Sequence, residues 1–90
     1  MFYSNLPSLD LHGETRETAV ILLNDFIRDS LKLRNYKIVI IHGIGKGILR
    51  DAVHKELKRN KSVVSFKMDF FNPGCTVVEL SNLFDKSSKK

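Results

Sequence analysis

The stretch Lys37-Ile38-Val39-Ile40-Ile41-His42-Gly43-Ile44-Gly45-Lys46-Gly47 decides the fold of this chain. Its four consecutive β-branched residues are typical of an interior strand in a parallel pair, which we expect over 37–42. The three glycines that follow cannot belong to a helix and predict a loop. The loop leads into a predicted helix over about 48–60, because apolar residues recur there at helical spacing, at Leu49, Ala52, Val53 and Leu57.

The residues before this unit predict another strand and another helix. Residues 8–12 alternate, with Leu9 and Leu11 on one face and Asp10 and His12 on the other, as in a strand covered on one side only. Gly13 ends the strand. Thr15 is a suitable N-cap for a helix over about 16–33, whose apolar face we expect to comprise Ala19, Leu23, Phe26, Ile27 and Leu31 or Ser30.

The residues after the second helix predict two more strands. A third strand is indicated by apolar residues in alternation, namely Val64, Phe66, Met68 and Phe70. Asn72-Pro73-Gly74 is a turn signal, so the strand over 76–80 must run antiparallel to the third. We therefore expect Phe66, Phe70 and Phe71 to belong to the core. Residues 81–90 should form a flexible tail.

The predicted order is β-α-β-α-β-β. It corresponds to an α/β (α+β) two-layer sandwich with a four-stranded mixed sheet. Right-handed crossovers place both helices on one face of the sheet and leave the other face open. A chain of 90 residues is short enough to form a single domain over 1–90, with its core within about 8–80.

Composition favours a cytoplasmic protein that binds a polyanion. No apolar run is long enough for a membrane span, the amino terminus lacks the pattern of a signal peptide, and one cysteine excludes a disulfide framework. The net charge is +5, and residues 37–61 hold seven of the fifteen basic side chains but only two of the ten acidic ones. Such clustering favours phosphate contacts. An ordinary solvated basic helix explains the charge equally well.

The carboxyl ends of the two parallel strands are the expected site, because ligands bind there in open α/β sheets. Asp10, His12 and His42 would meet at this edge. Two imidazoles that flank a phosphate could act as base and acid in RNA cleavage, with the 2′-hydroxyl attacking. Asp10 could orient the His12 imidazole or hold a hydrated divalent metal ion such as Mg²⁺ or Mn²⁺.

Phosphate contacts are expected around the start of the second helix, where amide groups and the helix dipole favour an anion. The residues that we assign to this role are Gly43, Gly45, Lys46, Gly47, Arg50, His54 and Lys58. Alternatively, the glycines form only a tight turn, and His54 is an ordinary surface residue. The spacing fits neither the P-loop nor the dinucleotide pattern, so a nucleotide-binding regulator is poorly supported.

Two motifs in this order resemble the signatures of the Smr (small MutS-related) domain family. They are Leu9-Asp10-Leu11-His12-Gly13 and His42-Gly43-x-Gly45-x-Gly47-x-Leu49, followed by Gly74-x-Thr76-Val77-Val78-x-Leu80. The resemblance implies a two-layer sandwich related to the C-terminal domain of a bacterial translation initiation factor. It also implies nicking or endonuclease activity on DNA or RNA, in some members on messenger RNA of stalled ribosomes. Asp10, Leu11 and His12 match the residues tied to cleavage, and His42, Gly43 and Gly45 match the second conserved edge.

Two functions remain open at this point. The first is an endonuclease that acts on RNA rather than DNA, with Asp10, His12 and His42 as the reacting set. The second is a non-catalytic module that binds nucleic acid or the ribosome through the same edge. In that alternative the phosphates are contacted by Lys46, Arg50, Lys55, Lys58 and Arg59. In either case we expect a monomer.

Overall fold

The computed structural model describes residues 5–81 of the chain. The elements, in order, are β1 (Ser8–Asp10), α1 (Arg16–Lys32), β2 (Lys37–Ile41), α2 (Ile48–Arg59), β3 (Val63–Met68) and β4 (Cys75–Leu80). The predicted order of helices and strands is confirmed. All but the first residue of the predicted tail lie outside the described residues. None of the helices within 5–81 combines the length and the apolar character needed to cross a membrane.

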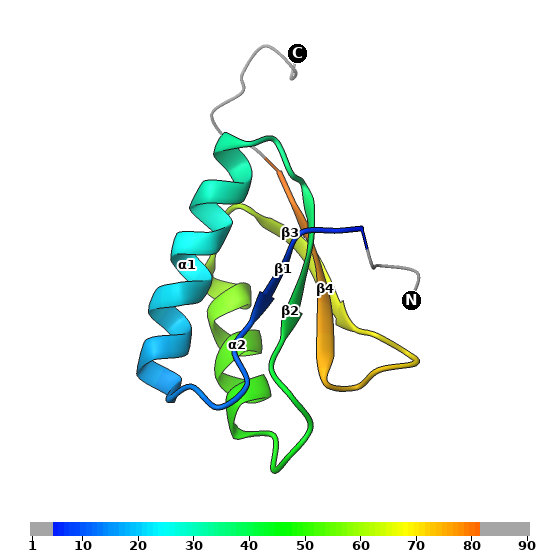
Figure 1. The fold of residues 1–90 in the computed structure, drawn as a ribbon. Helices are drawn as coiled ribbons and strands as arrows, with labels where there is room; N and C mark the ends of the chain where they lie inside the picture. Colours follow the sequence, from blue (N-terminus) through cyan, green and yellow to red (C-terminus); the bar gives the residue numbers. More distant parts are fainter. Residues whose placement is uncertain (1–4, 82–90) are drawn as a thin grey trace.

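The four strands form one mixed sheet in the order β1-β2-β4-β3. β1 runs parallel to β2, whereas β4 is antiparallel to both β2 and β3. Both helices cover the same face of the sheet, as Figure 1 shows, so the predicted two-layer arrangement is confirmed. β4 lies between β2 and β3, which makes β1 and β3 the edge strands of the sheet.

The core lies between the helices and the sheet, and its buried members come from α1, β2, α2 and β4, together with Leu11 just after β1. Its fully or nearly fully buried residues are Leu11, Ala19, Leu23, Ile27, Ile38, Ile40, Val53, Leu57, Val78 and Leu80. The helix that supplies three of them begins where the sequence predicts, because the Thr15 side chain accepts a hydrogen bond from the amide of Thr18 at 3.1 Å.

Two phenylalanines expected in the core are exposed instead, and so is Val64 of the alternating strand pattern. The register of β3 against β4 shifts between Val63 and Ser65, which turns the intervening Val64 outward and leaves it 64% exposed. The strand then ends at Met68, so that Phe70 and Phe71 fall in the turn to β4 and are 89% and 78% exposed. The alternating pattern therefore predicted Phe66, which packs against the core, but not these three.

Two neighbouring aliphatic residues of α1 test this account of the core. We expect Leu23→Ala to lower the free energy of unfolding by about 2–5 kcal/mol, because it leaves a cavity at a fully buried position. Ile21→Ala is the matched control and should change stability by less than about 0.5 kcal/mol, since Ile21 is 62% exposed. Urea denaturation monitored by circular dichroism measures both values. Equal losses in the two variants would contradict the assignment of the buried face.

Candidate active site

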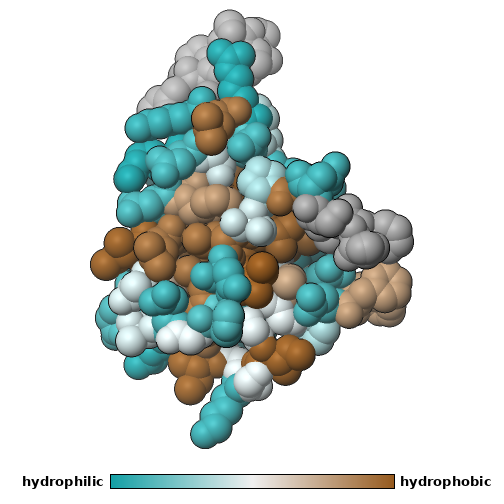
Figure 2. All heavy atoms as spheres, in the orientation of Figure 1, coloured by the Kyte–Doolittle hydropathy of each residue, from teal (hydrophilic) through white to brown (hydrophobic). Residues whose placement is uncertain are grey.

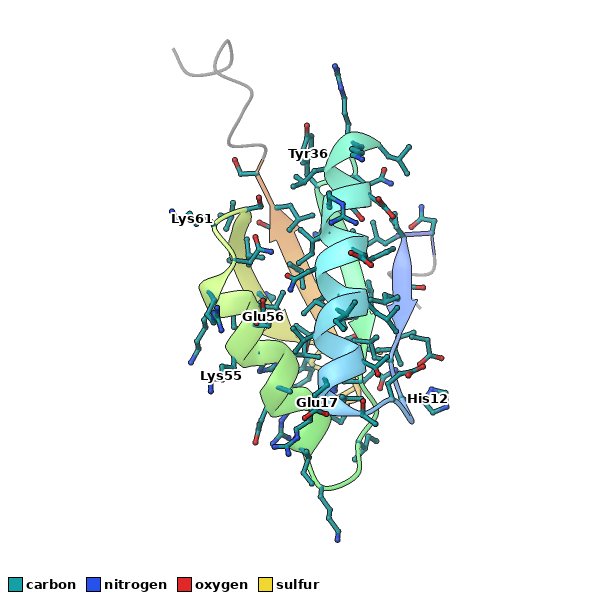
Figure 3. The ribbon with its side chains drawn as sticks, turned by 90° about the vertical axis from the view of Figure 1, so that its left-hand side faces the viewer. His12, Glu17, Tyr36, Lys55, Glu56 and Lys61 are labelled. Atoms are coloured by element: carbon teal, nitrogen blue, oxygen red, sulfur yellow. The ribbon has the colours of Figure 1, made fainter. Side chains whose placement is uncertain are left out.

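Asp10 and His12 form an ion pair at the carboxyl end of β1. Leu11 between them is fully buried, and its amide donates to the Ile41 carbonyl oxygen at 2.7 Å, which continues the pairing of β1 with β2 by one residue. Because successive side chains alternate, the two flanking residues point to the side away from the core. Nδ1 of His12 lies 2.6 Å from Oδ1 of Asp10, which also accepts the His12 amide at 3.1 Å. His12 stands at the lower edge of the sheet, turned away from the ribbon (Figure 3).

This pair fixes the chemistry of the His12 ring. A carboxylate can only accept, so Nδ1 carries the hydrogen and donates it to Asp10. The hydrogen bond and the charge of Asp10 raise the pKa of His12 above its usual range, and the same bond lowers the pKa of Asp10. The side chain of His12 is 71% exposed. Its remaining nitrogen, Nε2, is therefore accessible to a substrate, and the raised pKa favours the protonated ring.

The glycine loop lies directly beside this pair. Gly43 has a φ of 83° and packs so closely that a Cβ added to it would stand 3.4 Å from the Cβ of His12. The amides of His42 and Gly43 both donate to the Gly74 carbonyl oxygen, at 2.9 and 3.0 Å. Gly74 leaves little space for a side chain, because a Cβ there would lie 3.3 Å from the Gly43 backbone. These contacts hold the two sequence motifs together, as the parallel pairing of their strands predicts.

A cleft of about 670 Å³ separates the two motifs and is lined by residues 12–17 and 42–50. α2 begins at one of its walls with Gly47 as N-cap, and none of the described side chains caps the helix there. The amide groups of the first turn therefore face an open site. Lys46 is exposed in the cleft wall, and the Arg50 side chain lies against Gly47 while paired with Asp51 at 3.2 Å. The geometry suits a phosphate group.

His42 lies inside the protein, which is not where a reacting imidazole would be. It is 4% exposed, and both of its ring nitrogens have partners: Nδ1 is 3.0 Å from the Gly43 carbonyl oxygen and Nε2 is 2.8 Å from Oγ1 of Thr76. Burial lowers the pKa of His42. The structure therefore brings Asp10 and His12 together, whereas the His42 ring is buried at the cleft wall with both nitrogens already engaged.

Thr76 links His42 to His54 in a chain whose direction can be assigned. The Gly43 carbonyl only accepts, so His42 Nδ1 donates to it, and the Nε2 of a neutral His42 must accept from the Thr76 hydroxyl. The Thr76 oxygen then accepts from Nε2 of His54 at 2.8 Å. Burial, together with the charges of His42 and Arg50, lowers the pKa of His54, which favours the neutral rings that the chain requires. Thr76 is fully buried.

Two predicted phosphate ligands lie apart from the cleft. His54 is half-buried against Thr76 and Phe66, its ring centroid 5.0 Å from that of the phenyl group. Lys58 is exposed in the last turn of α2, about 15 Å along the helix axis from its first residue. Neither residue lines the cleft. Their assignment as nucleic-acid ligands stays a prediction.

A dedicated metal site is not evident within residues 5–81. No three histidine, cysteine or carboxylate side chains gather there in a way that could hold a metal ion. Oδ1 of Asp10 is already engaged by His12, and the carboxylates that line the cleft itself are Glu14 and Glu17. These groups do not supply the three gathered protein ligands of a catalytic zinc site.

Comparison with known proteins places the chain in a family. A sequence model of the Smr domain matches residues 9–81. The chain belongs to the Smr domain family. Proteins named endonuclease MutS2 from Streptococcus equi subsp. equi and Geobacillus thermodenitrificans are 43% and 41% identical over 75 residues, which is 80% of this chain. This chain spans only about 10% of the length of these relatives.

Two solved structures share the fold of this Smr domain. The Smr domain of Thermus thermophilus MutS2 superposes with a TM-score of 0.82 at 30% identity, covering 86% of this chain and all of that one. YdaL, a stand-alone small MutS-related protein from Escherichia coli, gives a TM-score of 0.81 at 22% identity, covering 91% of this chain and 72% of that one. The resemblance read from the two motifs is therefore confirmed at the level of family and fold.

Replacing Asp10 tests the ion pair. We expect Asp10→Asn to lower the pKa of His12 toward its ordinary value of 6.5, because the amide no longer favours the imidazolium. A pH titration of the three histidine rings by NMR measures this shift. The rings of His42 and His54 serve as internal controls and should keep their lowered pKa values. An unchanged His12 titration would show that the pair does not form in solution.

Replacing Thr76 tests the buried chain. Thr76→Val keeps the shape but removes the hydroxyl, which leaves two imidazoles without their partner, so we expect a loss of about 1–3 kcal/mol in unfolding free energy. Thr76→Ser is the matched control, because it keeps the hydroxyl and removes only a methyl group. Thermal or urea denaturation compares the two. If the serine variant proves the less stable one, the hydroxyl is not what the site depends on.

Proposed function

We propose that this protein is an endonuclease that cuts single RNA strands at the Asp10–His12 pair. The observation that carries the proposal is the exposed His12 ring, whose Nδ1 is bound by Asp10 and whose Nε2 is left accessible beside the cleft. The family membership and the name endonuclease borne by the MutS2 relatives agree with it.

The substrate phosphate would bind where the cleft offers positive charge. Lys46, Arg50 and the free amides at the start of α2 surround that position. A net charge of +5 favours the approach of a polyanion in general. A messenger RNA held on a ribosome is one substrate of this kind, and the family resemblance implies it for some members.

The ionisation of His12 assigns it the role of general acid. The 2′-oxygen attacks the phosphorus, the bond to the 5′-oxygen breaks, and the protonated Nε2 gives its proton to that leaving oxygen. Water takes the proton of the attacking hydroxyl, and the products are a 2′,3′-cyclic phosphate and a 5′-hydroxyl end. Because the nucleophile belongs to RNA, DNA is not cut by this route. The rate should fall as pH rises through the raised pKa of His12.

His42 has a positioning role in this proposal. Its ring holds the Gly43 carbonyl oxygen, and the adjacent backbone amides are fixed by Gly74. The cleft wall next to His12 is therefore rigid before the substrate arrives. The proposed step uses the His12 ring and water, so a divalent metal ion at Asp10 would assist phosphate binding rather than supply the proton.

A cleavage assay with labelled RNA and DNA strands, with and without EDTA, tests the proposal. Wild-type protein should cut the RNA in both conditions. We expect His12→Ala to reduce the rate by about 100- to 10,000-fold, the usual contribution of a general acid, while binding stays nearly intact. Lys46→Ala is the complementary variant, since it should weaken binding and lower the salt slope by about 0.7 for one lost phosphate contact.

The outcomes separate the alternatives. Equal cutting by His12→Ala and wild type would remove His12 from the reaction. Salt-sensitive binding by the wild type without any product would instead support the non-catalytic binding module. Cleavage that stops in EDTA would restore the metal-dependent alternative.

A further inference from the structure

The turn between β3 and β4 presents two phenylalanines to solvent. Phe70 is 89% exposed and Phe71 is 78% exposed, and their rings meet edge to face with centroids 5.1 Å apart. Apolar surface projects from the sheet at this turn, on the right of the molecule as seen in Figures 1 and 2. Neither ring belongs to the core, and adjacent exposed aromatic side chains are a common feature of interaction sites.

The backbone of this turn is fixed by hydrogen bonds. Asp69 accepts the amide of Phe71 through Oδ1 at 3.0 Å and the amide of Asn72 through its carbonyl oxygen at 3.2 Å. Asn72 in turn accepts the amides of Gly74 and Cys75, at 3.1 and 3.0 Å. The turn is also joined to the glycine loop through the Gly74 carbonyl oxygen. The two rings are therefore held at a defined place relative to the cleft.

A single row across the sheet connects the aromatic pair with the ion pair. Asp10 lies opposite Ile41, Ile41 lies opposite Cys75, and the Cys75 carbonyl oxygen accepts the amide of Asp69 at 3.0 Å. Three strand spacings of about 4.8 Å separate the ends of this row, which gives about 14 Å from Asp10 to Asp69. Phe70 follows Asp69 directly. At about 3.4 Å per stacked nucleotide, roughly four nucleotides cover that distance.

We propose that Phe70, supported edge-on by Phe71, is a stacking platform for an unpaired base of a single nucleic-acid strand. This inference rests on the proposed function, because it assumes that the phosphates of the same strand occupy the cleft. Aromatic side chains stack on bases of any sequence, and only unpaired bases offer a free face. The platform therefore selects single strands over duplexes at a point about four nucleotides from the scissile phosphate.

A nucleic acid fits this surface better than a protein partner does. Two aromatic side chains offer at most about 500 Å² of contact area, whereas a standard protein interface buries about 800 Å² on each partner. The cleft, whose glycine loop is hydrogen-bonded to this turn through Gly74, carries the exposed Lys46 and the Arg50 guanidinium, which suit phosphates. An aromatic side chain next to a basic groove is the usual arrangement in proteins that bind single strands.

The absence of tryptophan from the chain allows a direct test. Phe70→Trp introduces a single tryptophan, which can be excited selectively over the two tyrosines and keeps an aromatic face. Three probes of equal length are compared: a single strand of 2′-O-methyl RNA, which cannot be cut by 2′-attack, an abasic strand of the same charge, and a duplex. We expect the single strand to quench the tryptophan, and the abasic strand and the duplex to leave its emission nearly unchanged.

Affinity measurements complete the test. Phe70→Ala should bind the 2′-O-methyl strand about 5- to 100-fold more weakly, the contribution of one stacked base, and should bind the abasic strand as the wild type does. Leu33→Ala is the matched control, because Leu33 is 71% exposed at the end of α1, at the opposite end of the sheet. It should bind all probes as the wild type does.

Each outcome bears on one proposal. Equal affinity of Phe70→Ala and wild type for the single strand, or equal quenching by the abasic strand, overturns the stacking platform even if RNA is cut. A self-association that Phe70→Ala abolishes also overturns it, since the surface then binds a second copy. Quenching by the single strand alone supports the platform even if the wild type cuts nothing, in which case only the endonuclease proposal fails.

Discussion

The hydrogen bond from the Leu11 amide to the Ile41 carbonyl oxygen, 2.7 Å long, is the contact on which the site depends. It extends the parallel pairing of β1 and β2 to the last residues before the two glycine motifs. Because Leu11 is fully buried at this point, the alternation of the strand turns His12 out of the core and against Gly43. A shift of one residue in this register would exchange the buried and exposed side chains of β1. The site therefore follows from sheet pairing, and no long loop has to position it.

The pKa values of the histidines shift in opposite directions in the two parts of the site. His12 is exposed and paired with a carboxylate, which raises its pKa, whereas burial lowers the pKa of both His42 and His54. The buried pair stays neutral and supports the Gly43 backbone through Thr76, while the exposed ring keeps an exchangeable proton. One imidazole is thus available for proton transfer, and two hold the structure that surrounds it.

The alternation of apolar residues in the sequence predicted most of the strand positions and site residues, and the wrong predictions have identifiable causes. The alternation in residues 8–12 placed Asp10 and His12 correctly, and the parallel strand pair brought the two motifs together. The inward position of His42 continues the series of Ile38 and Ile40, which are both fully buried. Because Ile38 to Ile41 are all apolar, however, the pattern of β2 does not show which face is inward, and the orientation of His42 could not be read from it. The exposure of Phe70 was not predictable from alternation, because it depends on where β3 ends. The exposure of Val64 depends on a register shift that no local sequence pattern indicates.

Departures from the ordinary rules of folding gather at one end of this sheet. A histidine is buried there, a helix begins without a side-chain cap from the described residues, and two phenyl rings face solvent. Each departure carries a cost in stability, and none of these features belongs to the core that includes Ile40 and Val78. Their common location is the carboxyl end of the parallel strands, where this class of sheet binds its ligands. A site that holds a polyanion next to an unpaired base accounts for all three. The uncapped helix start offers amides to the phosphate, and the buried histidine fixes the backbone beside it. The exposed phenyl rings offer an aromatic face to the base.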